Sequence, residues 1–297
     1  MARRHPWVSV LFLAPVALAF VLVIVVPFIL GIYYSFTDFN GVRANLTFLG
    51  LSNYRAMFND PVFLHSFLLT LQYTAINIVL VNMVAFLLSL LVTSEMPGRN
   101  FLRSGFFVPN LIGGLVLGYI WQFIFNSVLL DLGRSLGFTA LSRSLISDKG
   151  TVIWAMSFVN TWQYAGYIMM IYVAAIQGIP ANLMEAANVD GANYPQRVRK
   201  ILMPMLASAF TVTLFLTLTN SFKQYDLNVS LTNGGPAALF MGKPSKASQL
   251  LAMNIYNTAI ASKRWGDGQA RAVVFFLVLV AFSLVQVWIN KRREVEM

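Results

Sequence analysis

The sequence predicts an all-α fold: a polytopic membrane protein with six transmembrane helices and a cytoplasmic loop between the fourth and the fifth. Three observations indicate this. The 297 residues are 58% hydrophobic and only 11% charged, and one soluble core of this size could not bury so much apolar surface. Long uncharged runs, each sufficient for a helix that crosses a bilayer, fill most of the chain. One charged segment with Gly and Pro, residues 185–204, separates two of these runs.

The first two spans are predicted at residues 8–34 and 67–92. The first follows from the absence of Asp, Glu, Lys and Arg between Pro6 and Thr37. A possible signal-peptide cleavage site lies at residues 17–19, but the apolar run continues well past it, so we expect an uncleaved span. Between the two spans lies a polar, aromatic loop that ends in a turn at residues 59–61.

The other four spans are predicted at residues 105–125, 152–176, 201–222 and 272–290. Pro109 and the Gly113-Gly114 pair interrupt the third span and predict a kink or a close helix contact. A long segment with a turn cluster at residues 232–236 separates the fifth span from the sixth. We expect the whole chain, residues 1–297, to form a single transmembrane domain.

The distribution of basic residues predicts the orientation. Ten of the 21 Lys and Arg residues lie in four short segments at residues 1–7, 93–103, 180–200 and 290–297. The opposite loops are about twice as long and carry the other eleven. The positive-inside rule therefore places both termini and the 185–204 segment in the cytoplasm.

The sequence argues against catalysis and ion coupling in this chain. There is no cysteine, and the two histidines are too few for a His-based metal site. The nearest approach to a phosphate-binding loop, Gly242-Lys243-Pro244, lacks the required residues at two positions. No predicted span contains a charged residue that could carry a proton or sodium ion. We expect no enzyme activity and no cofactor.

Uncharged polar and aromatic residues in the spans leave two interpretations open. Such residues commonly form hydrogen bonds between membrane helices. Amides, hydroxyls and aromatic faces also suit a neutral polyhydroxylated solute. The residues are Gln122 in the third span, Asn160, Trp162, Gln163, Tyr164 and Tyr167 in the fourth, Thr217, Thr219, Asn220 and Ser221 in the fifth, and Gln224 just beyond it.

The 185–204 segment resembles the signature loop of the permeases of binding-protein-dependent ABC importers. The residues in register with that pattern are Glu185, Ala186, Ala187, Asp190, Gly191, Ala192, Ile201 and Pro204. Val198 and Met203 stand where the pattern usually has an aromatic residue and Leu. Residues 48–54, 106–109 and 177–180 extend the similarity to the sugar-uptake branch. Residues 222–226 and 231–236 resemble the maltose or glycerol-phosphate permease type, the first member of a permease pair.

This resemblance implies a partner-driven importer in a bacterial or archaeal cytoplasmic (inner) membrane. It implies a second, different permease, two copies of a cytoplasmic ATPase that hold ATP and Mg, and an extracytoplasmic binding protein that delivers a sugar or oligosaccharide. The eight register residues would form a coupling helix on the ATPase, and no nucleic acid is expected. The resemblance implies a substrate pathway that comprises Asn160, Gln163, Tyr164, Tyr167, Thr217, Ser221 and Gln224, and we also predict Gln122 and Asn220 as pathway residues.

Three alternatives remain at this point. A glycerol-phosphate or other polar-solute importer would need a basic residue near the pathway, for which Lys223 is the nearest candidate. An ion-coupled carrier would transport without ATP. A non-transporting membrane scaffold would tolerate changes in the 185–204 segment.

Overall fold

The computed structural model describes residues 6–42, 45–138 and 143–291. Helices form most of this part of the chain, with one two-stranded sheet among the described residues. The chain groups into two compact units. Unit 1 contains the described residues up to Asp60 together with Ile255–Leu277, and unit 2 contains Pro61–Asn254 and the described residues from Val278 onward. A single domain over the whole chain stays a prediction.

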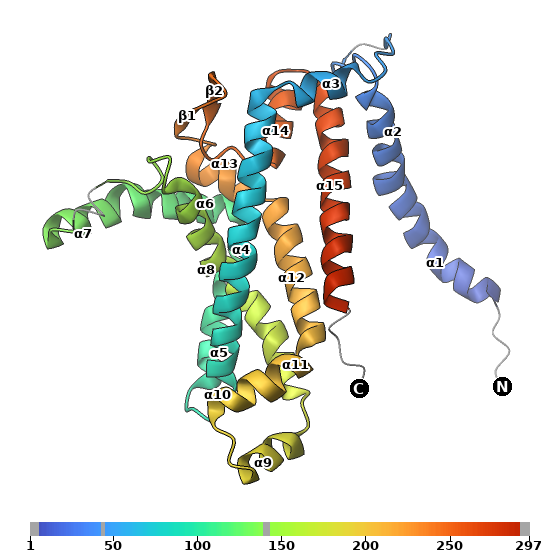
Figure 1. Ribbon diagram of the computed structural model, residues 1–297. Coiled ribbons are helices and arrows are strands. Elements are labelled where there is room, and N and C mark those ends of the chain that lie inside the picture. Colours follow the sequence, from blue (N-terminus) through green and yellow to red (C-terminus); the bar gives the residue numbers. More distant parts are fainter. Residues whose placement is uncertain (1–5, 43–44, 139–142, 292–297) are drawn as a thin grey trace. The chain divides into compact units, whose positions relative to one another are not determined.

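Unit 1 begins with the long apolar run that we expected as the first span (Figure 1). It forms α1 (Pro6–Phe20), a π-helical turn (Val21–Val25) and α2 (Val26–Ser35). The π-helical turn comes just before Pro27, whose ring has no N–H for the backbone ladder. Its remaining elements are α3 (Ser52–Phe58), the end of α14 (Leu251–Tyr256), a second π-helical turn (Asn257–Ala261) and the first half of α15 (Trp265–Lys291).

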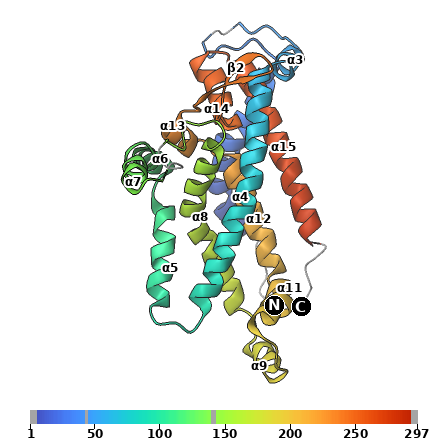
Figure 2. The same cartoon turned by 60° about the vertical axis from the view of Figure 1, so that its left-hand side comes forward.

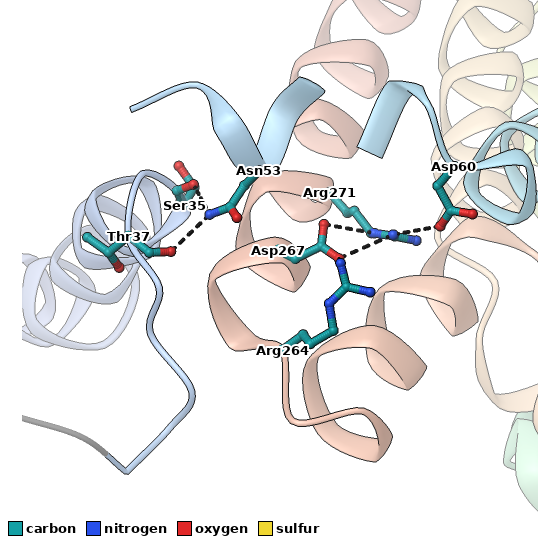
Figure 3. A network of polar contacts seen from close by, with 7 residues as sticks. All are labelled: Ser35, Thr37, Asn53, Asp60, Arg264, Asp267 and Arg271. Atoms are coloured by element: carbon teal, nitrogen blue, oxygen red, sulfur yellow. Dashed lines mark hydrogen bonds and ion pairs between the residues drawn. The ribbon is translucent and has the colours of Figure 1, made fainter. Parts of the chain in front are cut away.

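A buried ion-pair network holds one end of unit 1 together (Figure 3). The Arg271 guanidinium lies 2.8 Å from an Asp60 carboxylate oxygen and 3.2 Å from one of Asp267. Arg264 adds a second cation to Asp267 at 2.9 Å. The Arg271 side chain is only 3% exposed. Because its fork-shaped guanidinium reaches both carboxylates, it ties α15 to the end of the α3 segment.

A separate pair of hydrogen bonds joins α3 to the end of α2. The Asn53 side-chain amide donates to the backbone carbonyls of Ser35 and Thr37, each at 2.9 Å. The Tyr54 and Ser35 hydroxyls lie 2.7 Å apart. Figure 3 shows Asn53 pointing between Ser35 and Thr37. These bonds satisfy carbonyls that the last turn of a helix would otherwise leave without a donor.

Unit 2 is built on three helices that lie side by side in Figures 1 and 2: α4 (Pro61–Thr93), α8 (Val152–Gln177) and α12 (Ala207–Phe222). Much of their contact surface is hydrophobic, and its buried members include Val81, Ala85, Ala165, Ile168, Met169, Tyr172 and Ala209. The alanines allow the backbones to approach closely, as is typical of helices packed in membranes. Three of the predicted spans therefore form one bundle.

The segment that we predicted as one span at residues 105–125 is divided in the structure. It comprises α5 (Arg99–Phe107), a 3₁₀ turn (Val108–Leu111) and α6 (Gly114–Phe123), followed by a π-helical turn (Ile124–Val128) and α7 (Leu129–Leu136). Helix α5 runs along α8, whereas α6 and α7 run across that direction (Figures 1 and 2). The chain is extended at Ile112 and Gly113. A break therefore replaces the expected kink.

The contact between α5 and α8 requires a glycine. A methyl group at Gly166 would collide with the backbone carbonyl of Phe106, whereas one at Gly105 would meet nothing within 4 Å. We expect Gly166→Ala to lower the free energy of unfolding by ~1–3 kcal/mol through overpacking. Gly105→Ala, also in a helix, should leave it unchanged or raise it by up to ~1 kcal/mol. Thermal unfolding midpoints of the purified variants test this, and equal midpoints would contradict it.

The rest of unit 2 consists of shorter elements. A helical hairpin is formed by α9 (Ala181–Val189) and α10 (Tyr194–Arg197), and a π-helical turn (Val198–Leu202) and α11 (Met203–Met205) lead into α12. After α12 come α13 (Asp226–Thr232) and the antiparallel strands β1 (Ala237–Phe240) and β2 (Lys243–Lys246). His65 of α4 stacks on Phe240 at 4.7 Å and bonds to Ser245, which holds this β-hairpin on α4.

The helices fit four to six membrane crossings. Four described helices are long and apolar enough to cross a bilayer, and there are six if each of two bent helix pairs counts as one span. The bends are 73° between α8 and α9, and 73° between the Tyr194–Met205 segment and α12. The predicted fifth span, residues 201–222, thus contains a bend at Leu206, and α15 begins seven residues before the predicted sixth span. The exact membrane boundaries stay predictions.

Candidate functional site

The first candidate site is the α9–α10 hairpin. It lies at one end of unit 2, beyond the ends of α5, α8 and α12 in both views (Figures 1 and 2). Gly191 has φ +75°, a conformation that side chains other than Gly rarely adopt. The Asp190 and Ala192 amides donate to the Ala186 and Ala187 carbonyls, each at 2.9 Å. This pattern ends α9 sharply, for the reason predicted from the sequence.

The second half of the hairpin is fixed by side chains. Asn193 and Gln196 exchange side-chain and backbone hydrogen bonds, forming a capping box at the start of α10. The Arg197 guanidinium donates to the Asn188 side chain and lies 5.9 Å from the centre of the Tyr194 ring. Since Asn188 belongs to α9, these contacts join the two short helices into one preformed projection.

The hairpin exposes apolar and acidic side chains. Val189 is 88% exposed and Tyr194 52% exposed. Glu185 and Ala186 are exposed as well, whereas Ala187 is buried. The projection therefore presents apolar and acidic side chains together on its surface. In the part of the chain that is described, Glu185 has no ion-pair or hydrogen-bond partner.

The eight predicted coupling residues divide between two places. Six of them, Glu185, Ala186, Ala187, Asp190, Gly191 and Ala192, lie in α9 and the turn that follows it. Ile201 and Pro204 lie instead in the π-helical turn and α11, just before the bend into α12. Their position suits a role in setting the direction in which the chain leaves the hairpin.

The second candidate site is a cavity of about 390 Å³ beside the end of α12. Its lining comes from α8, α12 and the residues that follow α12: Tyr164, Leu216, Thr219, Asn220, Lys223, Gln224, Tyr225 and Asp226. The predicted pathway residues Tyr164, Asn220 and Gln224 are among them. The buried side-chain oxygen of Asn220 has no hydrogen-bond donor among the described residues. Lys223 and Asp226 contribute opposite charges, so the formally charged lining is neutral overall.

The other six predicted pathway residues lie outside this cavity. The Asn160 amide, 1% exposed, donates to Asn77 at 2.8 Å and accepts from Gln224 at 3.1 Å. Thr217 accepts from Asn82, and Gln122 and Gln163 donate to the Leu231 and Ile112 carbonyls. Ser221 is fully buried. Tyr167 lies 5.4 Å from Tyr164, ring centre to ring centre, and lines a more apolar groove between α5 and α8.

Residues 5–295 match the family of binding-protein-dependent transport system inner membrane components. The chain belongs to this family. It is 42% identical over 287 residues, 97% of this chain and 95% of the relative, to the probable starch degradation products transport system permease AmyD of Thermoanaerobacterium thermosulfurigenes. It is 31% identical over 291 residues to the probable ABC transporter permease YurN of Bacillus subtilis strain 168, covering 96% and 97% of the two chains.

The fold of this permease also matches a solved structure. The crystal structure of a bacterial ABC transporter involved in the import of the acidic polysaccharide alginate aligns with a TM-score of 0.82 at 18% identity, over 97% of this chain and 96% of that one. The family and this match confirm the predicted all-α membrane fold and the resemblance to ABC importer permeases. The protein is a multi-pass permease of the inner membrane.

Sequence reasoning missed five residues that organise the permease core: Asn77, Asn82, Ser157, Tyr172 and Thr213. In α4, the Asn82 amide donates to Thr217 at 3.2 Å and accepts from the Tyr172 hydroxyl at 3.0 Å. Thr213 donates to Tyr172 at 2.7 Å, and Asn77 bonds to Ser157 and Asn160. A signal was present for two of them: Asn77 and Asn82 are the two Asn residues of the uncharged span predicted at residues 67–92. Among the cavity residues, Thr219 was named only as a polar residue of the fifth span and Lys223 only as a candidate for an anionic solute, and Asp226 was not predicted.

Proposed function

We propose that this permease forms half of an ATP-driven import pathway for a neutral sugar oligosaccharide, and that the solute passes the cavity beside α12. The observation that carries the proposal is the lining of that cavity. Amide, hydroxyl and phenol groups both donate and accept hydrogen bonds, and the Tyr164 and Tyr225 rings suit the apolar faces of a sugar. AmyD, whose name refers to starch degradation products, points to an α-linked glucose oligosaccharide.

The proposal includes an energy source outside this chain. The α9–α10 hairpin, with its exposed Glu185 and Val189, would dock on a cytoplasmic ATPase, of which two copies would serve two different permeases. An extracytoplasmic binding protein would deliver the sugar, and both termini would lie in the cytoplasm. The uneven distribution of basic residues and the preformed shape of the hairpin support this arrangement.

A phosphorylated solute such as glycerol phosphate is the competing substrate. Lys223 does line the cavity, but Asp226 lines it too. A carboxylate beside the only lysine of the lining disfavours an anion, because like charges repel in a poorly hydrated site. A neutral oligosaccharide needs neither group to be neutralised.

The test is uptake by vesicles that contain the complete transporter and its binding protein. We expect labelled maltotriose to enter the vesicles only when they contain ATP. A protonophore should not abolish this uptake, and excess glycerol phosphate should not reduce it. Asn220→Leu should reduce uptake about tenfold or more at a subsaturating sugar concentration, because the Leu side chain cannot accept a hydrogen bond from a sugar hydroxyl. The control Asn100→Leu removes an exposed amide of α5. Competition by glycerol phosphate, or uptake without ATP, would refute the proposal.

A further inference from the structure

A second groove of unit 2 lies near the hairpin, on the wall formed by α11 and α12. It has a volume of about 500 Å³, and its apolar lining consists of Met203, Pro204, Ala207, Phe210 and Leu214. Ala207, Phe210 and Leu214 recur every three or four positions, so they follow one face of α12. Met203 and Pro204 lie before the bend at Leu206. The lining of this groove is therefore mainly apolar, unlike that of the polar cavity described above.

One end of this groove is basic. Arg199 lines it and also lines an adjoining cavity of about 570 Å³ to which Lys200, Asn193 and Gln196 contribute. Arg199 and Lys200 are exposed. Neither has a carboxylate within ion-pair distance among the described residues, whose ion pairs are formed by Arg134, Arg264 and Arg271. Two positive charges thus have no counterion among the described residues where the apolar groove opens.

A buried amide donor lies against the same groove. Asn290, near the end of α15, contributes to the lining, and its side-chain nitrogen is buried with no acceptor among the described residues. One turn earlier, Gln286 donates to the Thr211 carbonyl at 3.2 Å and fixes α15 on α12. An oxygen acceptor from outside the described residues would satisfy the Asn290 nitrogen.

We propose that this groove binds an anionic phospholipid from the leaflet next to the hairpin. An acyl chain would lie on the apolar residues, an ester or phosphate oxygen would accept from Asn290, and the headgroup charge would meet Arg199 and Lys200. Basic sites between membrane helices on the cytoplasmic side commonly bind anionic headgroups. The apolar wall, the amide donor and the basic residues match the three chemical parts of a phospholipid: the acyl tail, the glycerol ester and the phosphate. Neither a sugar nor an apolar partner helix combines these three parts.

The first test is native mass spectrometry of the complete transporter taken from membranes of dioleoylphosphatidylglycerol and dioleoylphosphatidylcholine. We expect retained phosphatidylglycerol. Since one basic residue contributes about 1 kcal/mol at an anionic surface, Arg199→Gln should weaken its binding about fivefold, and the double variant with Lys200→Gln about thirtyfold. The control Arg99→Gln removes an exposed charge of α5. Equal retention in Arg199→Gln and Arg99→Gln, or no preference over phosphatidylcholine, would overturn the proposal.

The second test keeps the charges and changes the groove. Ala207→Trp should fill the acyl site and abolish retention, and a photoreactive residue at Met203 in the assembled transporter should give an adduct with the mass of a phospholipid. An adduct with the second permease or with the ATPase would overturn the proposal, even if Ala207→Trp failed to fold. These readouts do not depend on transport, so they can fail while the proposed function stands.

Discussion

Glu185→Lys is expected to abolish coupled transport while the permease still inserts into the membrane. Glu185 is exposed on α9 and, within the described chain, takes part in no ion pair or hydrogen bond, so its reversal costs the fold little. If α9 sits in a groove of an ATPase, the new lysine places a like or unpaired charge at a desolvated contact. Such a change costs several kcal/mol. We expect ATP-dependent sugar uptake to fall at least tenfold in vesicles.

Glu95→Lys is the matched control for this prediction. Glu95 is an exposed acid in the short segment between α4 and α5, which the orientation argument places on the same side of the membrane. Glu95→Lys makes the same charge change outside the hairpin, so sugar uptake by this variant should remain close to that of the parent protein. An equal loss of uptake in both variants would show that the effect comes from net charge. Full uptake by Glu185→Lys would rule out the proposed docking.

Arg271→Ala is expected to destabilise unit 1 strongly. The guanidinium is the only group shown to bridge Asp60 and Asp267 in Figure 3, and Asp267 is 5% exposed. Removing one partner of a buried ion pair typically costs 3–5 kcal/mol. Since Asp267 keeps Arg264 as a second cation and Asp60 is partly exposed, we expect a cost of about 3 kcal/mol here. For a chain of this size we expect a fall of about 5–10 °C in the thermal unfolding midpoint.

Arg134→Ala provides the comparison. Arg134 lies 3.9 Å from Asp131, but both side chains are more than two-thirds exposed, at 68% and 77%. Exposed pairs contribute only about 0–1 kcal/mol, so this midpoint should hardly change. Similar shifts in Arg134→Ala and Arg271→Ala would show that burial of the network adds nothing.

Much of the fold was predictable because it depends on composition and local backbone chemistry. Uncharged runs long enough to cross a bilayer specified α4, α8 and α15. Gly191 specified the end of α9, because a left-handed residue at a helix end is a local requirement. The break after α5 was not predictable. Pro109 indicates a disturbed helix, but a full break needs a donor for the freed carbonyls, and Gln163 of α8 supplies one to Ile112.

The cavity was only partly predictable, for a similar reason. Helical spacing puts Asn160, Tyr164 and Tyr167 near one face, but it does not say which neighbour that face meets. Packing gives Asn160 the partners Asn77 and Gln224, and it leaves Tyr164 beside open space. Lys223 and Asp226 were treated as part of a loop because they follow the last residue of the fifth apolar run. Their return to the cavity depends on how the chain leaves α12.

Helix α8 runs without interruption from the cavity residue Tyr164 to its end at Gln177, directly before the hairpin. At 1.5 Å per residue these positions are about 20 Å apart. A stiff rod of this length acts as a lever: a tilt of about 10° at the hairpin end displaces the other end by ~3.5 Å if it pivots there. That displacement is comparable to the width of a hydroxyl group and its hydrogen bond. A modest push on α9 would thus suffice to make or break contacts with a sugar, without any rearrangement within the helix.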